Sequence, residues 1–257
     1  MPGWNSLLDL GCGCGAVALS ALLRLPGDTI HAGRRLMGLD KFESLVEATR
    51  RNAALLGLED MLKAEVADLT QEEEFSRLKS LPAFGPGGSG VGFDLVVANP
   101  PYRLHGQGRL PVTLERGAAL FGGLETLRAF VRFARMSVRT AREDGPGGIF
   151  CLSFPWARRQ ELAREMIRQS FRPERMLPVS AKPGRTPFML LLEARAATPD
   201  SMDSDVKCVI NMADICEDTL FLYEAAKGQT RPSERALALC PRLKPSGPQH
   251  LGWRQSA

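Results

Sequence analysis

The sequence predicts an α/β protein whose mostly parallel sheet is covered by helices on both faces. Short apolar segments alternate with amphipathic ones along most of the 257 residues, which is typical of parallel strands joined by crossover helices. The length suits one large domain. Apolar residues make up 44% of the chain and charged residues 24%, and these values argue against global disorder.

Seven segments are predicted as strands because each is short, apolar and bounded by turn residues or charges. They are residues 7–10, 37–40, 64–69, 93–102, 147–154, 175–180 and 188–195. Helices are expected at residues 16–25, 43–56, 71–79, 124–142 and 158–171. In the first helix, Val17, Ala21 and Leu25 are expected to face inward.

A polar break divides the chain into two parts. Residues 1–197 are expected to form the main domain, and residues 198–257 a C-terminal extension that is partly strand and helix and ends in a loosely ordered tail. No internal repeat is present.

The cysteines and the hydropathy indicate a cytoplasmic protein. Six cysteines without a CxxC pair or a Cys/His cluster favour reduced thiols over a disulfide framework, and no metal site is expected. No apolar run reaches the ~20 residues that span a bilayer. No signal sequence is evident, and no obligate protein partner is inferred.

Basic side chains are concentrated in one third of the chain. Residues 103–185 carry 16 basic and 7 acidic side chains, whereas residues 1–102 carry 9 and 13. Such a block suits phosphates and predicts RNA binding through Arg103, Arg109, Arg128 and Arg132. The alternative is that these arginines form solvated helix faces.

The first strand leads directly into a glycine-rich loop. Asp9 is followed by Gly11, Gly13 and Gly15 in the stretch DLGCGCG. Glycines let a backbone approach a ligand closely, and the helix that follows offers free N–H groups. The spacing is neither that of a dinucleotide fingerprint nor that of a phosphate loop, and a tight turn between a strand and a helix would also use glycine.

Acids follow the next two strands. Asp40 can accept hydrogen bonds from both hydroxyls of a ribose, and Asp68 can accept one from an exocyclic amine such as that of adenine. Ligands of open α/β sheets bind at these carboxyl ends of strands. Either acid would alternatively serve as a helix cap.

The fourth strand ends in Asn99-Pro100-Pro101-Tyr102. Prolines lack an N–H and fix φ, which leaves the Asn99 amide oxygen and the Pro100 carbonyl as acceptors for a planar NH2 group. Tyr102 offers a ring on which a flat substrate stacks. A simple proline-rich turn is the alternative.

Together, DLGCGCG, MGLD, ADL and NPPY in this order resemble the class I S-adenosylmethionine (SAM)-dependent N-methyltransferases, over residues 7–195. The later segments GGIFCLSFP, LLLEARA and FLYEAA are similar in layout to the bacterial tRNA-valine adenine-N6 methyltransferase family. The resemblance implies a Rossmann-like fold with seven strands and SAM as cofactor.

The resemblance also assigns roles to the residues. The segment Asp9–Gly15 would surround the methionine part of the cofactor, Asp40 would bind its ribose and Asp68 its adenine. Asn99, Pro100, Pro101 and Tyr102 would hold a flipped base, most simply an adenine of tRNA or another structured RNA, for direct methyl transfer.

Other interpretations remain open. Release factor glutamine methyltransferases share the glycine loop and NPPY but normally begin with a helical domain, whereas only eight residues precede Asp9 here, so the front of the chain is expected to be truncated. Ribosomal-RNA guanine-N2 methyltransferases use a similar motif. NAD-dependent dehydrogenases fit poorly, and an inactive RNA-binding protein with this fold is a further possibility.

Overall fold

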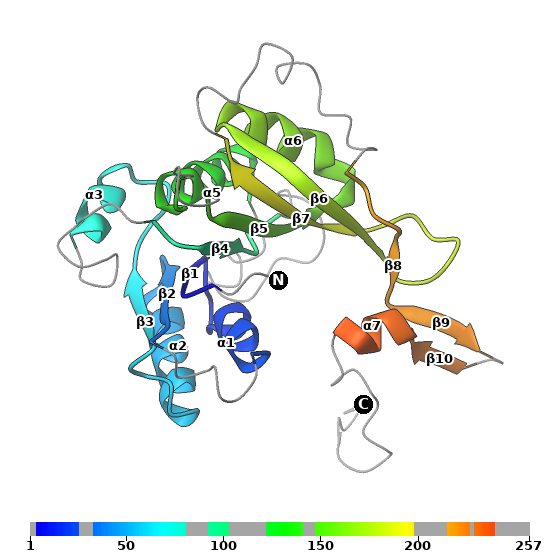
Figure 1. The fold of residues 1–257 in the computed structure, drawn as a ribbon, viewed down its shortest axis with the longest axis horizontal. Helices are drawn as coiled ribbons and strands as arrows, with labels where there is room; N and C mark the ends of the chain where they lie inside the picture. Colours follow the sequence, from blue (N-terminus) through cyan, green and yellow to red (C-terminus); the bar gives the residue numbers. More distant parts are fainter. Residues whose placement is uncertain are drawn as a thin grey trace, which may run out of the picture.

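An eight-stranded sheet forms the centre of the computed structural model, with the strand order β3-β2-β1-β4-β5-β7-β6-β8 (Figure 1). The structure describes residues 4–25, 33–80, 92–102, 122–140, 147–197, 215–226 and 229–239. The strands of this sheet are β1 (Ser6–Leu10), β2 (Arg35–Asp40), β3 (Leu62–Val66), β4 (Leu95–Ala98), β5 (Ile149–Pro155), β6 (Phe171–Ser180), β7 (Met189–Ala196) and β8 (Leu220–Phe221).

The predicted α/β class and the mostly parallel sheet are confirmed. Strands β1 to β5 pair in parallel, β7 is antiparallel to both β5 and β6, and β8 is parallel to β6. The count of seven strands was one short, because β8 lies in the predicted C-terminal extension and still joins the sheet. Two residues are too few to stand out as an apolar segment.

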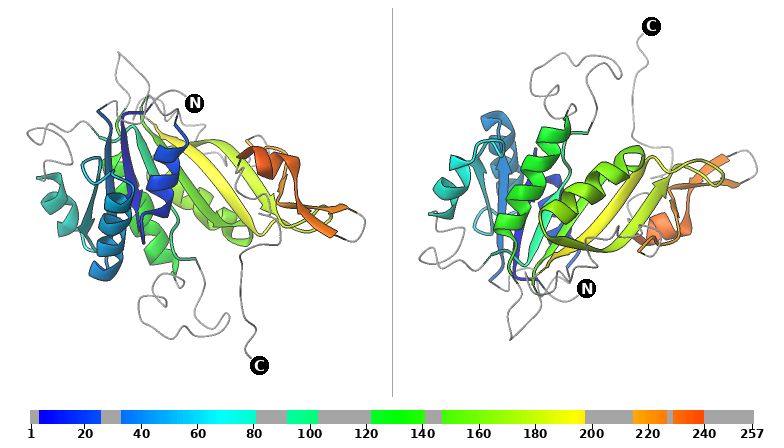
Figure 2. Two further views of the ribbon diagram at one scale, coloured as in Figure 1. Left: turned by 90° about the horizontal axis from the view of Figure 1, so that it is seen from below. Right: turned by 90° about the horizontal axis from the view of Figure 1, so that it is seen from above.

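Helices cover both faces of the sheet (Figures 1 and 2). The helices α1 (Ala16–Leu23) and α2 (Glu43–Leu55) pack on one face, and α3 (Glu73–Lys79), α5 (Leu124–Ser137) and α6 (Arg159–Arg168) pack on the other. Strand β1 serves both layers, since Leu7 packs toward α1 whereas Leu8 and Leu10 pack toward α5. Alternate side chains of a strand point to opposite faces.

The inward face predicted for the first helix is wrong at Val17, whereas Ala21 and Leu25 are partly buried and pack against the core. Ala18, Leu19 and Leu22 are its buried residues, whereas Val17 is 39% exposed. The helix begins only after Gly15, and its short length leaves one narrow stripe for the core. Val17 therefore faces outward at the start of the helix, next to the glycine loop.

The predicted helix at residues 124–142 ends early, at Ser137. Val138 forms a parallel bridge with Phe93. The Phe93 N–H donates to the Ser137 carbonyl at 2.8 Å, and the Arg139 N–H donates to the Phe93 carbonyl at 2.9 Å. These bonds satisfy the backbone in an extended conformation, so the helix does not continue.

The C-terminal part that the structure describes forms a small unit beside the sheet edge (Figure 2). Strands β9 (Tyr223–Ala226) and β10 (Gln229–Pro232) form a hairpin, followed by α7 (Glu234–Leu239). Ala236 packs with Val179 and Leu220 in a separate apolar cluster. Among the described residues, no helix combines the length and the apolar character needed to cross a membrane.

The carboxylate of Asp94 ties the starts of β1 and β4 together. Its Oδ2 accepts hydrogen bonds from the Asn5 and Ser6 N–H groups at 2.9 and 3.0 Å and from the Ser6 hydroxyl at 3.1 Å. Its Oδ1 lies 3.1 Å from Arg139 Nε. The side chain of Asp94 is only 21% exposed, so its removal would leave several polar partners without a substitute.

We expect Asp94→Ala to lower the free energy of unfolding by about 2–4 kcal/mol. The matched control is Asp60→Ala, because the Asp60 side chain is fully exposed and lies 3.8 Å from Lys63. Urea denaturation measures both variants. Equal stabilities for the two variants would contradict the role assigned to Asp94.

Candidate functional site

Strand register brings residues of four parallel strands to one level of the sheet. Leu10 of β1 pairs with Leu39 of β2 and with Ala98 of β4. Ala98 in turn pairs with Leu152 of β5. The residues that follow these four are therefore neighbours across the carboxyl edge of the sheet, where ligands of open α/β sheets bind.

Gly11, Asp40, Asn99 and Ser153 occupy this next level. The first three were predicted as site residues, whereas Ser153 was not. Its position depends on the register between β4 and β5, which no local pattern reveals.

A cavity of about 320 Å³ lies at this edge, within the size range of small-molecule sites. Six of the predicted site residues line it: Gly11, Gly13, Asp40, Asp68, Asn99 and Pro101. The cavity thus joins the glycine loop, both acids and the Asn-Pro-Pro corner, as the sequence analysis expected.

The glycine loop needs its glycines for backbone conformation. Gly11, Gly13 and Gly15 all have positive φ, at 69°, 56° and 80°, a region that favours glycine. A Cβ on Gly15 would lie 2.9 Å from Thr49 Cγ2, whereas a Cβ on Gly13 would meet nothing within 4 Å. The position of a Cβ on Gly13 therefore faces the open space of the cavity, whereas Gly15 packs against α2.

Three side chains hold this loop in place. The Thr49 hydroxyl donates to the Gly13 carbonyl at 2.8 Å, and the Asn52 amide donates to the Cys14 carbonyl at 2.9 Å. Asp40 Oδ2 accepts from the Gly13 N–H at 2.9 Å. Sequence reasoning missed Thr49 and Asn52, because both lie on α2 and their only signal is a polar residue on an amphipathic helix.

Asp9 lies in β1 on the side of the glycine loop away from the cavity, and it is not among the residues that line the cavity. It is 1% exposed, and its Oδ2 accepts from the Ala18 N–H at 3.1 Å. The helix α1 has Gly15 at its N-cap, which offers no capping side chain. Asp9 therefore supplies the missing cap from the preceding strand.

Burial raises the pKa of Asp9 to about 7, with the charge of Asp40 adding to the shift and the bond from Ala18 opposing it. The thiol of Cys12, also buried in the loop, has its pKa raised to about 12 by desolvation. A thiol with such a pKa is not a nucleophile at neutral pH.

The two predicted acids differ in how they are held. Asp40 Oδ1 accepts from the Phe42 N–H at 3.1 Å while its other oxygen binds Gly13, so Asp40 links β2 to the glycine loop. Asp68 Oδ1 accepts from both the N–H and the hydroxyl of Thr70, at 3.0 and 2.7 Å. Asp68 thus forms a local turn instead of a helix cap.

The Asn99 side chain contacts Ser153 directly. Asn99 Oδ1 accepts from the Ser153 hydroxyl at 2.5 Å, and an amide oxygen has a second lone pair for another donor. Pro100 is buried, and Tyr102 packs partly buried against the main core. Asn99 and Pro101 are therefore the part of the motif that lines the cavity.

Apolar side chains complete the cavity wall. Phe130 and Thr126 of α5 line it, together with Val17, Phe42, Leu45 and Leu69. A Cβ on Gly11 would lie 3.0 Å from Phe130 Cζ, so this ring closes the cavity above the loop. Phe130 lies three residues after Leu127 on the apolar face of the helix, and this spacing was the signal that could have identified it.

The arginines predicted to bind RNA are engaged by carboxylates where the structure describes them. Arg128 lies 2.6 Å from Glu125 and 3.4 Å from the buried Glu165, and Arg132 pairs with Glu72. Arg103 and Arg109 lie outside the described residues. RNA binding by these four side chains stays a prediction.

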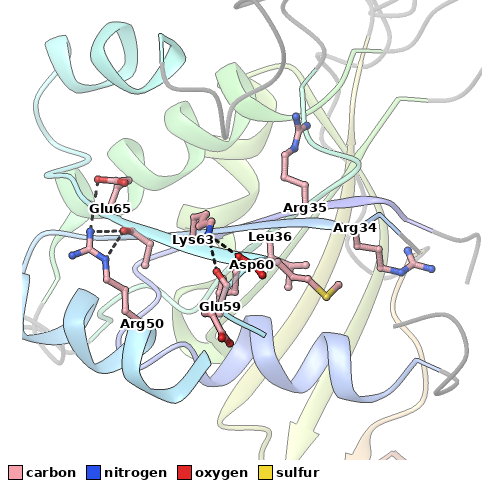
Figure 3. A pocket seen from close by; sticks show the side chains of 11 residues that line it. Arg34, Arg35, Leu36, Arg50, Glu59, Asp60, Lys63 and Glu65 are labelled. Atoms are coloured by element: carbon pink, nitrogen blue, oxygen red, sulfur yellow. Dashed lines mark hydrogen bonds and ion pairs between the residues drawn. The ribbon is translucent and has the colours of Figure 1, made fainter. Parts of the chain in front are cut away.

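A larger hollow of about 610 Å³ lies at the opposite edge of the sheet, around the starts of β2 and β3 (Figure 3). Arg34, Arg35 and Arg50 line it but point in different directions. The Arg50 guanidinium is occupied by the Ala64 carbonyl, at 3.1 and 2.7 Å. The polar groups do not converge there, so the smaller cavity is the better candidate site.

In the part of the chain that the structure describes, no three His, Cys, Asp or Glu side chains gather closely enough to hold a metal ion. The polar side chains and backbone groups that line the cavity include the Asp40 and Asp68 carboxylates and the Asn99 amide.

Among solved structures, the chain resembles a predicted O-methyltransferase from Agrobacterium tumefaciens. The TM-score is 0.54 with 17% identity, over 88% of this chain and 85% of that one. The chain has the class I methyltransferase fold. At this identity the likeness establishes the fold alone.

Two curated relatives are similar in sequence. The human MTRF1L release factor glutamine methyltransferase is 31% identical over 148 residues, which are 56% of this chain and 39% of that protein. The release factor glutamine methyltransferase of Chlorobaculum tepidum is 33% identical over 97 residues, 38% of this chain and 27% of that protein. The chain thus spans less than half the length of either relative. No protein-family model matches it.

The names of these relatives differ from the family that the sequence placed first. The sequence analysis placed a tRNA adenine-N6 methyltransferase first, whereas both relatives are named release factor glutamine methyltransferases. The tRNA family was ranked first on the layout of the segments GGIFCLSFP, LLLEARA and FLYEAA, and the release factor family lower on the few residues before Asp9. None of these segments lines the cavity.

We expect Asp9→Asn to change how stability depends on pH. Between the ordinary pKa of 3.8 and the folded value of about 7, folded wild-type protein keeps a proton that the unfolded chain releases. The contribution of Asp9 to stability is therefore greatest below this window and is lost as pH rises through it.

Asparagine does not titrate. The free energy of unfolding of the variant should therefore rise relative to that of the wild type between about pH 4 and about pH 7. Urea denaturation at several pH values measures this difference. A difference that does not vary with pH would show that Asp9 titrates normally.

Proposed function

We propose that this chain is a SAM-dependent N-methyltransferase whose acceptor is the side-chain amide of a protein glutamine. One observation carries the proposal: a single cavity joins the glycine loop, the Asp40 carboxylate and Asn99, each at the carboxyl end of an adjacent parallel strand. The names of the two curated relatives support glutamine as acceptor.

The residues of the cavity fit SAM. Gly13 leaves open space where a side chain would intrude. Asp40 and Asp68 offer carboxylate oxygens for hydroxyl and amine donors, and Phe42 and Leu69, which lie close to these acids in the sequence, supply apolar surface for a flat base. Asp40 would hold the ribose, Asp68 the adenine, and the glycine loop the methionine part.

The bound cofactor supplies a methyl group already activated by its positive sulfonium. The protein then has to place an acceptor nitrogen in line with that group, and positioning provides most of the rate. Asn99 Oδ1 and the Pro100 carbonyl would accept the two hydrogens of a planar NH2 group. Two acceptors fix the plane of the group and direct the nitrogen toward the cofactor.

Ser153 assists this role of Asn99. Its hydroxyl occupies one lone pair of Asn99 Oδ1, which fixes the carboxamide orientation and leaves the second lone pair for the acceptor. A hydrogen bond from a neighbouring residue holds a site side chain in one rotamer, so that the position of its polar atoms varies less.

A nucleobase amine is the second candidate acceptor, and one feature favours it. Beyond Ser153, Arg159 lies over the Trp156 ring at 4.6 Å, and the backbone N–H of Trp156 donates to the backbone carbonyl of the half-exposed Phe188 at 3.2 Å. Aromatic and guanidinium planes together stack bases. This surface would hold a base that has been turned out of an RNA loop.

We expect Asp40→Ala to weaken SAM binding about 100-fold, because it removes a charged acceptor and releases the Gly13 N–H. Isothermal titration with SAM measures the affinity, with Asp60→Ala as a control outside the cavity. Unchanged affinity in Asp40→Ala would exclude this cavity as the cofactor site.

Asn99→Ala should reduce the rate of methyl transfer about 100-fold or more, while SAM affinity changes little. Transfer of radiolabelled methyl to a purified bacterial release factor, and in parallel to bulk tRNA, measures the rate and identifies the acceptor class. Full turnover by this variant would refute the role of Asn99.

A further inference from the structure

The guanidinium of Arg158 lies behind the Asn-Pro-Pro-Tyr corner. Arg158 ends the short 3-10 helix η4 (Trp156–Arg158), which connects β5 to α6. Its side chain is only 10% exposed. A buried arginine is rare unless its donors are used.

Arg158 joins two segments that lie 20 positions apart in the sequence. Its Nη1 donates to the Tyr102 carbonyl at 3.0 Å and to the Gly122 carbonyl at 3.2 Å. Tyr102 closes the corner that begins at Asn99, and Gly122 directly precedes Gly123, the N-cap of α5.

The guanidinium is itself held from two sides. Glu161 accepts from Arg158 Nη2 at 2.9 Å and from Nε at 3.2 Å, a bidentate pairing that fixes the plane of the fork. The Phe154 ring lies 5.1 Å from the guanidinium carbon. The donor on Nη1 is therefore preoriented toward the two carbonyls.

The two segments are in close contact at the point where Arg158 joins them. A Cβ on Gly122 would collide with the Pro101 carbonyl oxygen. Pro101 lines the cavity, and so do Thr126 and Phe130 in the helix that starts after Gly122. The contact thus sets the distance between the two walls on the acceptor side.

The corner cannot fix itself through its own backbone. Pro100 and Pro101 have no N–H to donate, so this part of the chain has fewer backbone bonds than an ordinary turn. Its carbonyls need donors from elsewhere, and Arg158 supplies one to Tyr102.

We propose that Arg158 is a positioning residue for the methyl acceptor: it holds the Asn99–Tyr102 corner against the start of α5, so that an acceptor nitrogen is aligned for transfer. The inference rests on the proposed function and deepens it. The cofactor loop lies on other elements, at the ends of β1 and β2, so the role of Arg158 concerns the acceptor and not SAM.

Arg158→Lys tests this role with the charge retained. A lysine ammonium is a point donor and cannot pair bidentately with Glu161 while it donates to two carbonyls. We expect the SAM affinity to stay within about twofold, whereas kcat for methyl transfer falls about 10–100-fold. The matched control is Arg168→Lys, which also alters an arginine of an i,i+3 pair, here with Glu165 at 3.7 Å.

Two further variants approach the same corner from other sides. Glu161→Gln keeps Arg158 but loosens its orientation, and an intermediate loss of kcat is expected. Gly122→Ala forces the start of α5 away from Pro101 and should lower kcat with SAM affinity preserved. Thermal unfolding verifies that each variant is folded.

The measurements are SAM affinity by isothermal titration and steady-state transfer to a purified bacterial release factor and to bulk tRNA. A loss of kcat with SAM binding retained, in the arginine variant but not in the control, supports the inference. Unchanged kcat in folded Arg158→Lys overturns it, and so does a parallel loss of SAM binding. A wild-type chain that binds no SAM or methylates neither acceptor refutes the proposed function and the role of Arg158 with it.

Discussion

The hydrogen bonding of β1 to β2 on one side and to β4 on the other is the constraint on which the cavity depends. Both pairings are parallel and share one register at Leu10. Gly11, Asp40 and Asn99 are far apart in the sequence, and this register alone brings them to the same edge. A shift of β2 or β4 by one residue would turn the Asp40 or the Asn99 side chain toward the opposite face.

The alternation of strands and helices, the glycine loop and the acids after the strands were predictable because each leaves a local pattern. Ser153 and Arg158 left none, since one depends on the pairing of β4 with β5 and the other on a contact between η4 and the distant Tyr102. Val17 was placed inward because helical periodicity identifies a stripe but not its absolute orientation in a helix of eight residues. The end of α5 at Ser137 depends on Phe93, which lies in another part of the chain.

The arginine-rich third of the chain shows how composition differs from surface charge. Arg132 pairs with Glu72 and Arg139 with Asp94, so acids from the first part of the chain neutralise arginines from the second. A charge count within a window cannot reveal such pairs. Arg159 is a different case, because its guanidinium lies over the Trp156 ring and its partner is thus an aromatic ring and not a carboxylate.

The position of β7 between β5 and β6 has a consequence for synthesis on the ribosome. The strands β1 to β5 can pair as they emerge, because each finds its neighbour among segments already made. By contrast, β6 emerges before the strand that separates it from β5, and its edge stays unpaired until Met189–Ala196 has been translated. The first five strands form the cavity edge early, whereas a pause during translation of β7 would expose the edges of both β5 and β6 to other chains.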